Sequence, residues 1–170
     1  MRYLILGCGC RGLALAGALR AGGHVVRGTT RDPERQSSIA GSGVEPFVGD
    51  PDRVGTLVPA LQHVGVLCLL LGSARGEPER LEALHGPRLE MLLTKLIDTT
   101  VRGIVYEAAG TIPGPVLGHG AELVRGACER SRIPFSLLEA NPTDHKAWLA
   151  RAVAAVHPIN ILKPTELDWS

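Results

Sequence analysis

The stretch Gly7-Cys8-Gly9-Cys10-Arg11-Gly12 decides the fold of this chain of 170 residues. It follows the apolar run Tyr3–Leu6 and leads into a helix-like segment, Arg11–Ala21, which Gly22 and Gly23 end. A strand that enters a helix through three spaced glycines is typical of a dinucleotide-binding β–α turn. The first glycine allows the tight turn, the second lets a pyrophosphate approach the backbone, and the third lets the helix pack on the strand.

The remainder of the chain continues this alternation of short apolar runs and longer amphipathic segments. The expected strands are Tyr3–Leu6, His24–Arg27, Val44–Val48, Val64–Leu71, Gly103–Tyr106 and Pro134–Leu138. Most of these runs are continuous, which is typical of strands buried on both faces of a parallel sheet. The expected helices are Arg11–Ala21, one opened by Asp32-Pro33, Asp52–Leu61, two pieces within 77–98 broken at Gly86-Pro87, Pro115–Arg130 and Thr143–Val156. We therefore predict an α/β fold, a doubly wound six-stranded parallel sheet (Rossmann fold) in three α/β/α layers, with strand order 3-2-1-4-5-6.

Length and composition set further bounds. We expect residues 1–156 to form one NAD(P)-binding domain and residues 157–170 an irregular tail. Hydrophobic residues make up 45% of the chain but aromatic residues only 4%, so the core must be aliphatic. A net charge of +1 gives no general attraction to nucleic acid or to a membrane, and we expect neither as a partner. The longest apolar stretch, Val64–Leu71, is far too short for a membrane span.

The four cysteines do not form a recognisable disulfide framework. Cys8 and Cys10 lie in the glycine turn and Cys68 lies in an apolar run. This distribution indicates a reducing, cytoplasmic location. A metal site at Cys8 and Cys10 would need further ligands nearby, and none is visible, so we expect no metal. Small side chains that fit a crowded turn explain the pair better.

The end of the second expected strand bears on the choice of cofactor. NAD sites usually place Asp or Glu about 20 residues after the glycines, where it holds the ribose 2′-hydroxyl. Here no acid precedes Asp32, which is expected to cap a helix. Thr29 and Thr30 can donate hydrogen bonds to a phosphate, and Arg31 offers a forked charged contact, with Arg11 as a second cation. We therefore expect NADP(H), with NAD(H) as the less favoured cofactor. The alternative is that Arg31 is an ordinary solvated residue.

The stretch from Leu4 to Arg31 resembles the opening of atypical and extended short-chain dehydrogenases/reductases, including NmrA-like and epimerase-like proteins. Gly49-Asp50, Leu70–Ser73 and Arg102–Tyr106 resemble later segments of the same family. The resemblance implies that Asp50 contacts the adenine amino group and that the loop after the fourth strand borders adenine and ribose. The expected cofactor-binding residues are Gly7, Gly9, Cys10, Arg11, Gly12, Thr29, Thr30, Arg31, Asp50, Leu71, Gly72 and Ser73.

The chain departs from this family at the catalytic positions. Family enzymes usually carry Ser or Thr just after the fifth strand and a Tyr-x-x-x-Lys pair on the next helix. Here Glu107-Ala108-Ala109 stands at the serine positions, Tyr106 is followed four residues later by Gly110, and no later tyrosine exists. The usual proton-transfer residues are therefore missing. The remaining catalytic candidates are Glu107, Thr111, His119 and His145.

Two functions of different classes remain open. One is an NADP-dependent, reductase-like oxidoreductase of unknown substrate with non-standard catalytic residues. The other is a non-catalytic NADP(H)-binding sensor or regulator that acts through a protein partner. Most dinucleotide domains serve redox enzymes, whereas loss of the usual catalytic set favours the second reading. The leucine stripe within Leu89–Ile97 and the tail are candidate contact surfaces for a homodimer.

Overall fold

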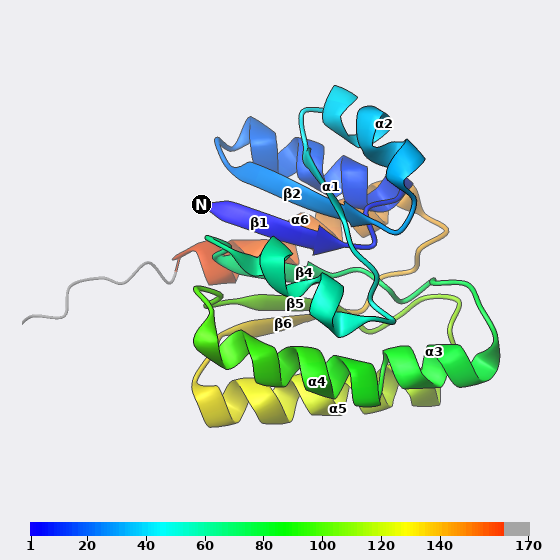
Figure 1. Cartoon of the computed structure of the whole chain (residues 1–170). Coiled ribbons are helices and arrows are strands. Elements are labelled where there is room, and N and C mark those ends of the chain that lie inside the picture. Colours follow the sequence, from blue (N-terminus) through cyan, green and yellow to red (C-terminus); the bar gives the residue numbers. More distant parts are fainter. Residues whose placement is uncertain (162–170) are drawn as a thin grey trace, which may run out of the picture.

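The structure, a computed structural model that describes residues 1–161, contains one six-stranded sheet in the order β3-β2-β1-β4-β5-β6 (Figure 1). All five neighbouring strand pairs are parallel. The strands are β1 (Arg2–Leu6), β2 (Val25–Thr30), β3 (Glu45–Val48), β4 (Val66–Leu69), β5 (Ile104–Glu107) and β6 (Phe135–Leu138). The predicted Rossmann fold and its strand order are confirmed.

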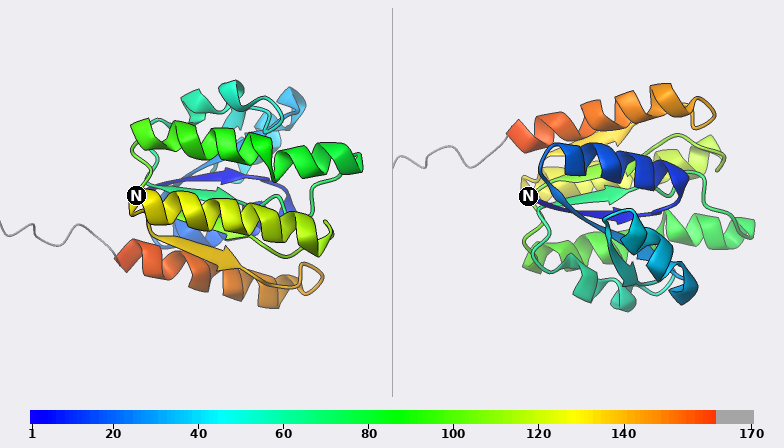
Figure 2. Two further views of the ribbon diagram at one scale, coloured as in Figure 1. Left: turned by 90° about the horizontal axis from the view of Figure 1, so that it is seen from below. Right: turned by 90° about the horizontal axis from the view of Figure 1, so that it is seen from above.

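Helices cover both faces of the sheet, which gives three layers (Figure 2). The side chains of β1 show how the faces divide, because Tyr3 and Ile5 enter one core cluster and Leu4 and Leu6 enter the other. The first cluster is covered by α1 (Cys10–Ala21), α2 (Gln36–Gly41) and α6 (His145–Ile161). The second is covered by the 3₁₀ segments η2 (Val54–Thr56) and η3 (Val58–Leu61) together with α4 (Pro87–Lys95) and α5 (Gly114–Ser131). Both clusters are built mainly from aliphatic side chains, as the composition predicts.

Several helix boundaries follow the expected start and stop residues. The 3₁₀ turn η1 (Pro33–Arg35) has Asp32 as its N-cap, and the Asp32 Oδ1 accepts a hydrogen bond of 2.9 Å from the Glu34 N–H. The predicted break within 77–98 separates α3 (Pro78–Leu84) from α4, which a short 3₁₀ turn, η4 (Leu96–Asp98), then extends. The break falls at Gly86, where a Cβ would lie 2.7 Å from the carbonyl oxygen of Glu82.

The expected α-helix at Asp52–Leu61 is wrong. The chain forms two 3₁₀ helices there, η2 (Val54–Thr56) and η3 (Val58–Leu61). Pro59 has no N–H with which to extend an α-helical hydrogen-bond ladder, so the segment remains in short turns. Leu57 and Leu61 are nevertheless buried at 1% exposure each, so the apolar pattern predicts the packed face correctly although the helix type differs.

The expected irregular tail is wrong for residues 157–161, because α6 continues through the expected boundary at 156 to Ile161. Ile159 is 4% exposed and packs against Gly103, where a Cβ would lie 2.2 Å from the Ile159 Cγ2. This contact holds the last turns of the helix even though Pro158 lies inside it. The part of the tail beyond Ile161 lies outside the described residues.

The leucine stripe of α4 does not form the exposed homodimer contact surface that we expect from the sequence. Leu89, Leu92, Leu93 and Leu96 are buried against the sheet, and only Ile97, at 65% exposure, points clearly to solvent. The stripe belongs to the core because a helix on an α/β sheet must bury one apolar face. Among residues 1–161, no helix has both the length and the apolar character needed to cross a membrane.

Candidate functional site: a cleft beside the glycine turn

The three glycines of the turn meet different steric requirements. Gly7 has φ +87°, and a Cβ on it would lie 2.2 Å from the carbonyl oxygen of Leu70. A Cβ on Gly12 would lie 2.6 Å from the carbonyl oxygen of Gly7. Gly9, the N-cap of α1, has no heavy atom within 4 Å of its would-be Cβ. The fold therefore requires glycine at 7 and 12, whereas the open space at Gly9 fits a group that approaches the backbone from outside.

The two cysteines of the turn have different environments. Cys8 is 2% exposed and packs against Gly28, where a Cβ would lie 2.5 Å from the Cys8 sulfur. Burial raises the pKa of the Cys8 thiol to about 11, which keeps it protonated at neutral pH. Cys10 is exposed at the start of α1. Among the described residues, no three His, Cys, Asp or Glu side chains come together as a metal site requires.

Two cavities flank the glycine turn at the carboxyl ends of the strands, where ligands of open α/β sheets bind. The first cavity, of about 570 Å³, extends toward the ends of β2 and β3. The second cavity, of about 390 Å³, extends toward residues 142–145 at the start of α6. The two cavities share the lining residues Gly7, Gly9, Arg11, Leu70 and Ser73, so they are parts of one cleft. Both volumes suit small-molecule ligands.

The residues expected to select the cofactor come together in the first cavity. Thr29, Thr30 and Arg31 all line it. Thr30 Oγ1 is already engaged with the backbone of Asp32, accepting from its N–H at 3.1 Å and donating to its carbonyl oxygen at 3.2 Å. The Arg31 side chain is 53% exposed, and its Nη1 lies 3.7 Å from Asp52 Oδ2.

Arg35 is a cavity residue that the sequence analysis missed. Its Nη2 donates a hydrogen bond of 3.2 Å to the carbonyl oxygen of Cys8, and the side chain lines the first cavity. No local motif marks Arg35, because it ends the short 3₁₀ turn η1 and only the fold brings its side chain to Cys8. The first cavity therefore presents two arginines near the end of β2.

Asp52 organises a cluster of arginines beside this cavity. Its carboxylate forms ion pairs with Arg31, with Arg88 at 3.8 Å, and with Arg80 in a direct hydrogen bond. Arg88 Nε also donates to the backbone carbonyl of Asp52 at 2.9 Å. Because one carboxylate faces three guanidinium groups, the cluster keeps a surplus of positive charge.

Two of the expected cofactor-binding residues do not line either cavity. Asp50 Oδ1 accepts a hydrogen bond of 2.9 Å from the Asp52 N–H, while its neighbours Gly49 and Pro51 line the first cavity. Gly72 is buried behind the wall formed by Leu71 and Ser73. The contact of Asp50 with adenine stays a prediction.

Glu107, the first catalytic candidate, is completely buried at 0% exposure. Its Oε1 accepts from the Gly72 N–H at 2.8 Å, and its Oε2 accepts from the Trp148 Nε1–H at 2.9 Å. Arg11 Nη2 lies 3.7 Å from Oε1, and the Arg11 guanidinium stands 5.3 Å from the centre of the Trp148 ring. Burial raises the pKa of the Glu107 carboxyl, and the contacts with Arg11, Trp148 and Gly72 partly offset that rise. The buried carboxylate of Glu107 therefore connects β5 to α6 through Trp148 and to the glycine turn through Arg11.

The other three candidates separate into two groups. Thr111 and His145 line the second cavity, and the Thr111 N–H donates to Ser73 Oγ at 3.2 Å. His119 is exposed on α5 and lines neither cavity of the cleft. The second cavity also contains Thr143, which the sequence analysis did not single out.

Tyr106 is a core residue. It is 1% exposed, and its hydroxyl lies 2.6 Å from Nδ1 of His85, which is itself 2% exposed. His85 Nε2 lies 3.0 Å from the carbonyl oxygen of Leu71. Burial raises the pKa of Tyr106 and lowers that of His85, so both side chains stay neutral at pH 7. The pair links β5 to the loop that borders the cleft.

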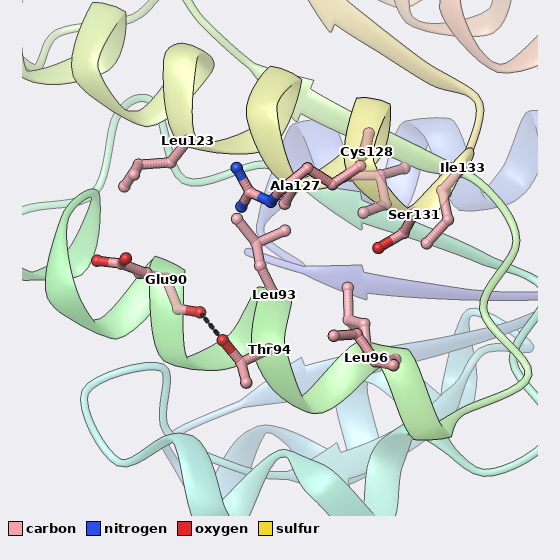
Figure 3. A pocket seen from close by; sticks show the side chains of 12 residues that line it. Glu90, Leu93, Thr94, Leu96, Leu123, Ala127, Cys128, Ser131 and Ile133 are labelled. Carbon is pink, nitrogen blue, oxygen red and sulfur yellow. Dashed lines mark hydrogen bonds between the residues drawn. The ribbon is translucent and has the colours of Figure 1, made fainter.

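A third cavity, of about 110 Å³, lies between α4 and α5 (Figure 3). Leu93, Leu96, Ala127 and Ile133 are among its lining residues, and Ile104 at the start of β5 contributes to it. It therefore lies toward the amino ends of the strands, away from the glycine turn, and it takes no part in the cleft.

No protein-family model and no curated protein matches the sequence. Many solved structures do match the fold. One is a short-chain dehydrogenase/reductase superfamily protein from Agrobacterium tumefaciens with bound NAD, at 22% identity and a TM-score of 0.68, covering 82% of this chain and 48% of that one. Another is the Citrobacter sp. triphenylmethane reductase complexed with NADP(H), at 21% identity and a TM-score of 0.62, covering 82% and 49%.

A third similar structure is ChuY, an anaerobillin reductase from Escherichia coli O157:H7, at 14% identity and a TM-score of 0.59, covering 82% of this chain and 72% of that one. The present chain spans about half the length of the first two proteins. These similarities show that the chain shares its fold with these proteins, as the sequence resemblance predicts. One neighbour carries NAD and another NADP(H), so the fold does not select between the two cofactors.

Proposed function

We propose that this protein binds NADP(H) in the cleft beside the glycine turn and acts as a reductase-like oxidoreductase. The observation that carries the proposal is the open space at Gly9, at the junction of two cavities at the carboxyl edge of the sheet. A nicotinamide dinucleotide bound there would supply hydride-transfer chemistry. The substrate is a small molecule that shares the second cavity with the nicotinamide end.

The chain's own groups fit the parts of such a cofactor. The start of α1 presents free backbone N–H groups and the positive end of the helix dipole to a pyrophosphate at Gly9. Arg31 and Arg35 lie where they can hold a 2′-phosphate, whereas the buried Thr29 hydroxyl already donates to the carbonyl oxygen of Ile5 at 3.5 Å. The loop containing Leu71 and Ser73 would border the adenosine.

The preference for NADP depends on the charges at the end of β2. The two arginines favour a phosphate, whereas Asp32, which also lines the first cavity, is engaged through Oδ1 in capping η1. A charge-assisted contact contributes about 1.5–3 kcal/mol, which corresponds to a preference of roughly 10- to 100-fold for NADP over NAD.

The test is calorimetric titration of wild type and three variants with both cofactors at fixed salt. Arg31→Ala and Arg35→Ala should weaken NADP binding and leave NAD binding almost unchanged. Asp32→Asn is the matched control, because asparagine still caps the turn but carries no charge. It should strengthen NADP binding slightly. A marked loss of NAD affinity in Asp32→Asn, with equal wild-type affinities, would show that Asp32 holds the ribose of NAD.

A non-catalytic role as an NADP(H) sensor is the second candidate function. It is favoured by the burial of both Glu107 and Tyr106, which leaves neither residue accessible to a substrate. Thr111 and His145 are the candidates that reach the second cavity. Loss of NADPH absorbance with a panel of carbonyl compounds, diminished in Thr111→Val or His145→Gln, supports the enzyme. NADPH binding without turnover on any of them supports the sensor.

A further inference from the structure

The second cavity has a distinctive chemical lining. Its polar side chains are three hydroxyls, a thiol and two basic groups: Ser73, Thr111, Thr143, Cys10, Arg11 and His145. Among the described residues that line it, none is Asp or Glu. The nearest carboxylate to Arg11, that of Glu107, is buried behind the wall. The Thr143 hydroxyl already donates to Asn141 Oδ1 at 2.8 Å. The other hydroxyls and the basic side chains supply hydrogen-bond donors, and Arg11 supplies positive charge, with no acidic side chain among the described lining residues.

Arg11 is held at this cavity by contacts that leave its donors free. Glu107 attracts the guanidinium at 3.7 Å, and the Trp148 ring supports it at 5.3 Å. Neither contact is a hydrogen bond, and both oxygens of Glu107 already accept from Gly72 and Trp148. Within residues 1–161 the guanidinium has no hydrogen-bond acceptor, although it carries five N–H donors.

Arg11 lines both cavities, but its contacts lie on the side of the second one. The phosphate-selecting residues lie at the end of β2, near one edge of the sheet. Arg11 instead reaches the end of β5 and a residue of α6, on the other side of β1. The groups that hold Arg11 therefore lie on the side of the cleft where the second cavity extends.

We propose that the second cavity binds an anionic group of the substrate, a carboxylate or a phosphate ester, and that Arg11 is the residue that binds it. The identification of this anion as part of a substrate rests on the proposed function, whereas the anion site itself does not. A planar guanidinium with free donors matches the two oxygens of a carboxylate or phosphate. The substrate class is thus a small anionic carbonyl or hydroxy compound.

The test uses Trp148 as an internal reporter, because its ring lies against Arg11. The only other tryptophan is Trp169, so the experiment is carried out in full-length protein with Trp169→Phe. Oxalate and inorganic phosphate are titrated into the protein, with and without NADP⁺, while tryptophan emission and heat are recorded. Oxamide, which is similar in shape to oxalate but neutral, is the control ligand.

We expect oxalate or phosphate to bind saturably and change Trp148 emission, and oxamide to do neither. Arg11→Gln should weaken anion binding roughly tenfold or more, as loss of a charge-assisted contact predicts. If that variant does not fold, Arg11→Lys keeps the charge without the planar fork and should weaken binding severalfold. Arg35→Gln is the matched control, because it removes an arginine from the first cavity only, and it should leave the emission change intact.

The outcomes separate this inference from the cofactor proposal. Anion binding that depends on Arg11 in a protein that does not bind NADP⁺ supports the anion site and contradicts the proposed function. NADP⁺ binding with no emission change for either anion overturns the anion site alone. A tenfold loss of NADP⁺ affinity in Arg11→Gln, with unchanged oxalate and phosphate binding, assigns Arg11 to the cofactor pyrophosphate and also overturns the inference.

Discussion

Gly7 and Gly9 stand two residues apart in one turn, yet only Gly7 is required by the fold. The chain itself would accept a side chain at Gly9, since its φ of −86° is an ordinary value and no heavy atom lies within 4 Å of a Cβ there. A valine would instead occupy the space where a pyrophosphate must approach. Gly9→Val should therefore fold normally and lose dinucleotide affinity by at least roughly tenfold, about 1.4 kcal/mol. Calorimetric titration with NADPH measures this.

Gly17→Val is the matched control for that experiment. Gly17 lies in α1, its Cβ position is equally open, and it lines neither cavity of the cleft. It should keep the wild-type affinity. Equal affinities in Gly9→Val and Gly17→Val, both folded, would remove the cofactor from the glycine turn.

Glu107 makes a second residue-scale prediction, which concerns pH. Its pKa is raised by burial, so the folded state holds the proton more tightly than the unfolded chain does. This contribution to stability is fully present below the unfolded pKa of about 4.3 and is lost as pH rises through the higher folded pKa. Glu107→Gln cannot titrate. The difference in unfolding free energy, wild type minus Glu107→Gln, should therefore fall as pH rises above about 4.3.

Urea unfolding of both proteins at a series of pH values measures that difference. The sign is decisive, because a carboxylate stabilised mainly by Arg11 would have a lowered pKa, and the difference would then grow with pH. A growing difference would mean that the ion pair outweighs burial at Glu107.

At the scale of elements, the contact between α5 and β5 depends on one glycine. A Cβ on Gly120 would lie 1.9 Å from the Tyr106 hydroxyl, whereas Gly118, in the same helix, has no heavy atom within 4 Å. Gly118→Ala should stabilise the protein by about 0.5–1 kcal/mol through helix propensity. Gly120→Ala should destabilise it by about 1–3 kcal/mol, because the added methyl overpacks the core. Urea unfolding measures both, and a stabilised Gly120→Ala would show that the α5–β5 contact adjusts at little cost.

The elements also show what a sequence can and cannot predict. Continuous apolar runs identify all six strands, because buried parallel strands carry such runs on both faces. The same reasoning is wrong about Asp52–Leu61, since periodicity reports which side chains are buried and not which hydrogen-bond ladder connects them. The local pattern also cannot predict how far α6 extends, because its last turns depend on the contact of Ile159 with Gly103, which is distant in the chain.

The candidate site was predictable to a similar degree. The glycine turn and the residues at the end of β2 come from local motifs, and the structure brings them to one cleft. The role of Glu107 was not predictable, because its burial depends on Trp148, 41 residues away in sequence. Arg35 was missed because an exposed-looking arginine in a short turn gives no sign that its side chain folds back to Cys8.

At the scale of the whole molecule, charge is balanced overall and unbalanced locally. The net charge is +1, so the protein exerts little long-range attraction on an anionic cofactor. The first cavity nevertheless carries Arg31 and Arg35, beside an Asp52 cluster with surplus positive charge. Any electrostatic preference for NADP must therefore arise at short range, from the end of β2.

That distribution predicts how salt acts on cofactor choice. Arg31 is half exposed, so its attraction to a 2′-phosphate is screened as the Debye length falls from about 10 Å at 0.1 M salt to about 3 Å at 1 M. Contacts of the backbone N–H groups at the start of α1 serve NADP and NAD alike. The ratio of NAD to NADP dissociation constants should therefore decrease with added salt in the wild type. It should stay nearly constant in an Arg31→Ala/Arg35→Ala double variant, where the short-range charges are gone. Titrations at several NaCl concentrations measure both ratios. A wild-type ratio that does not change with salt would mean that the 2′-phosphate is not bound by these arginines.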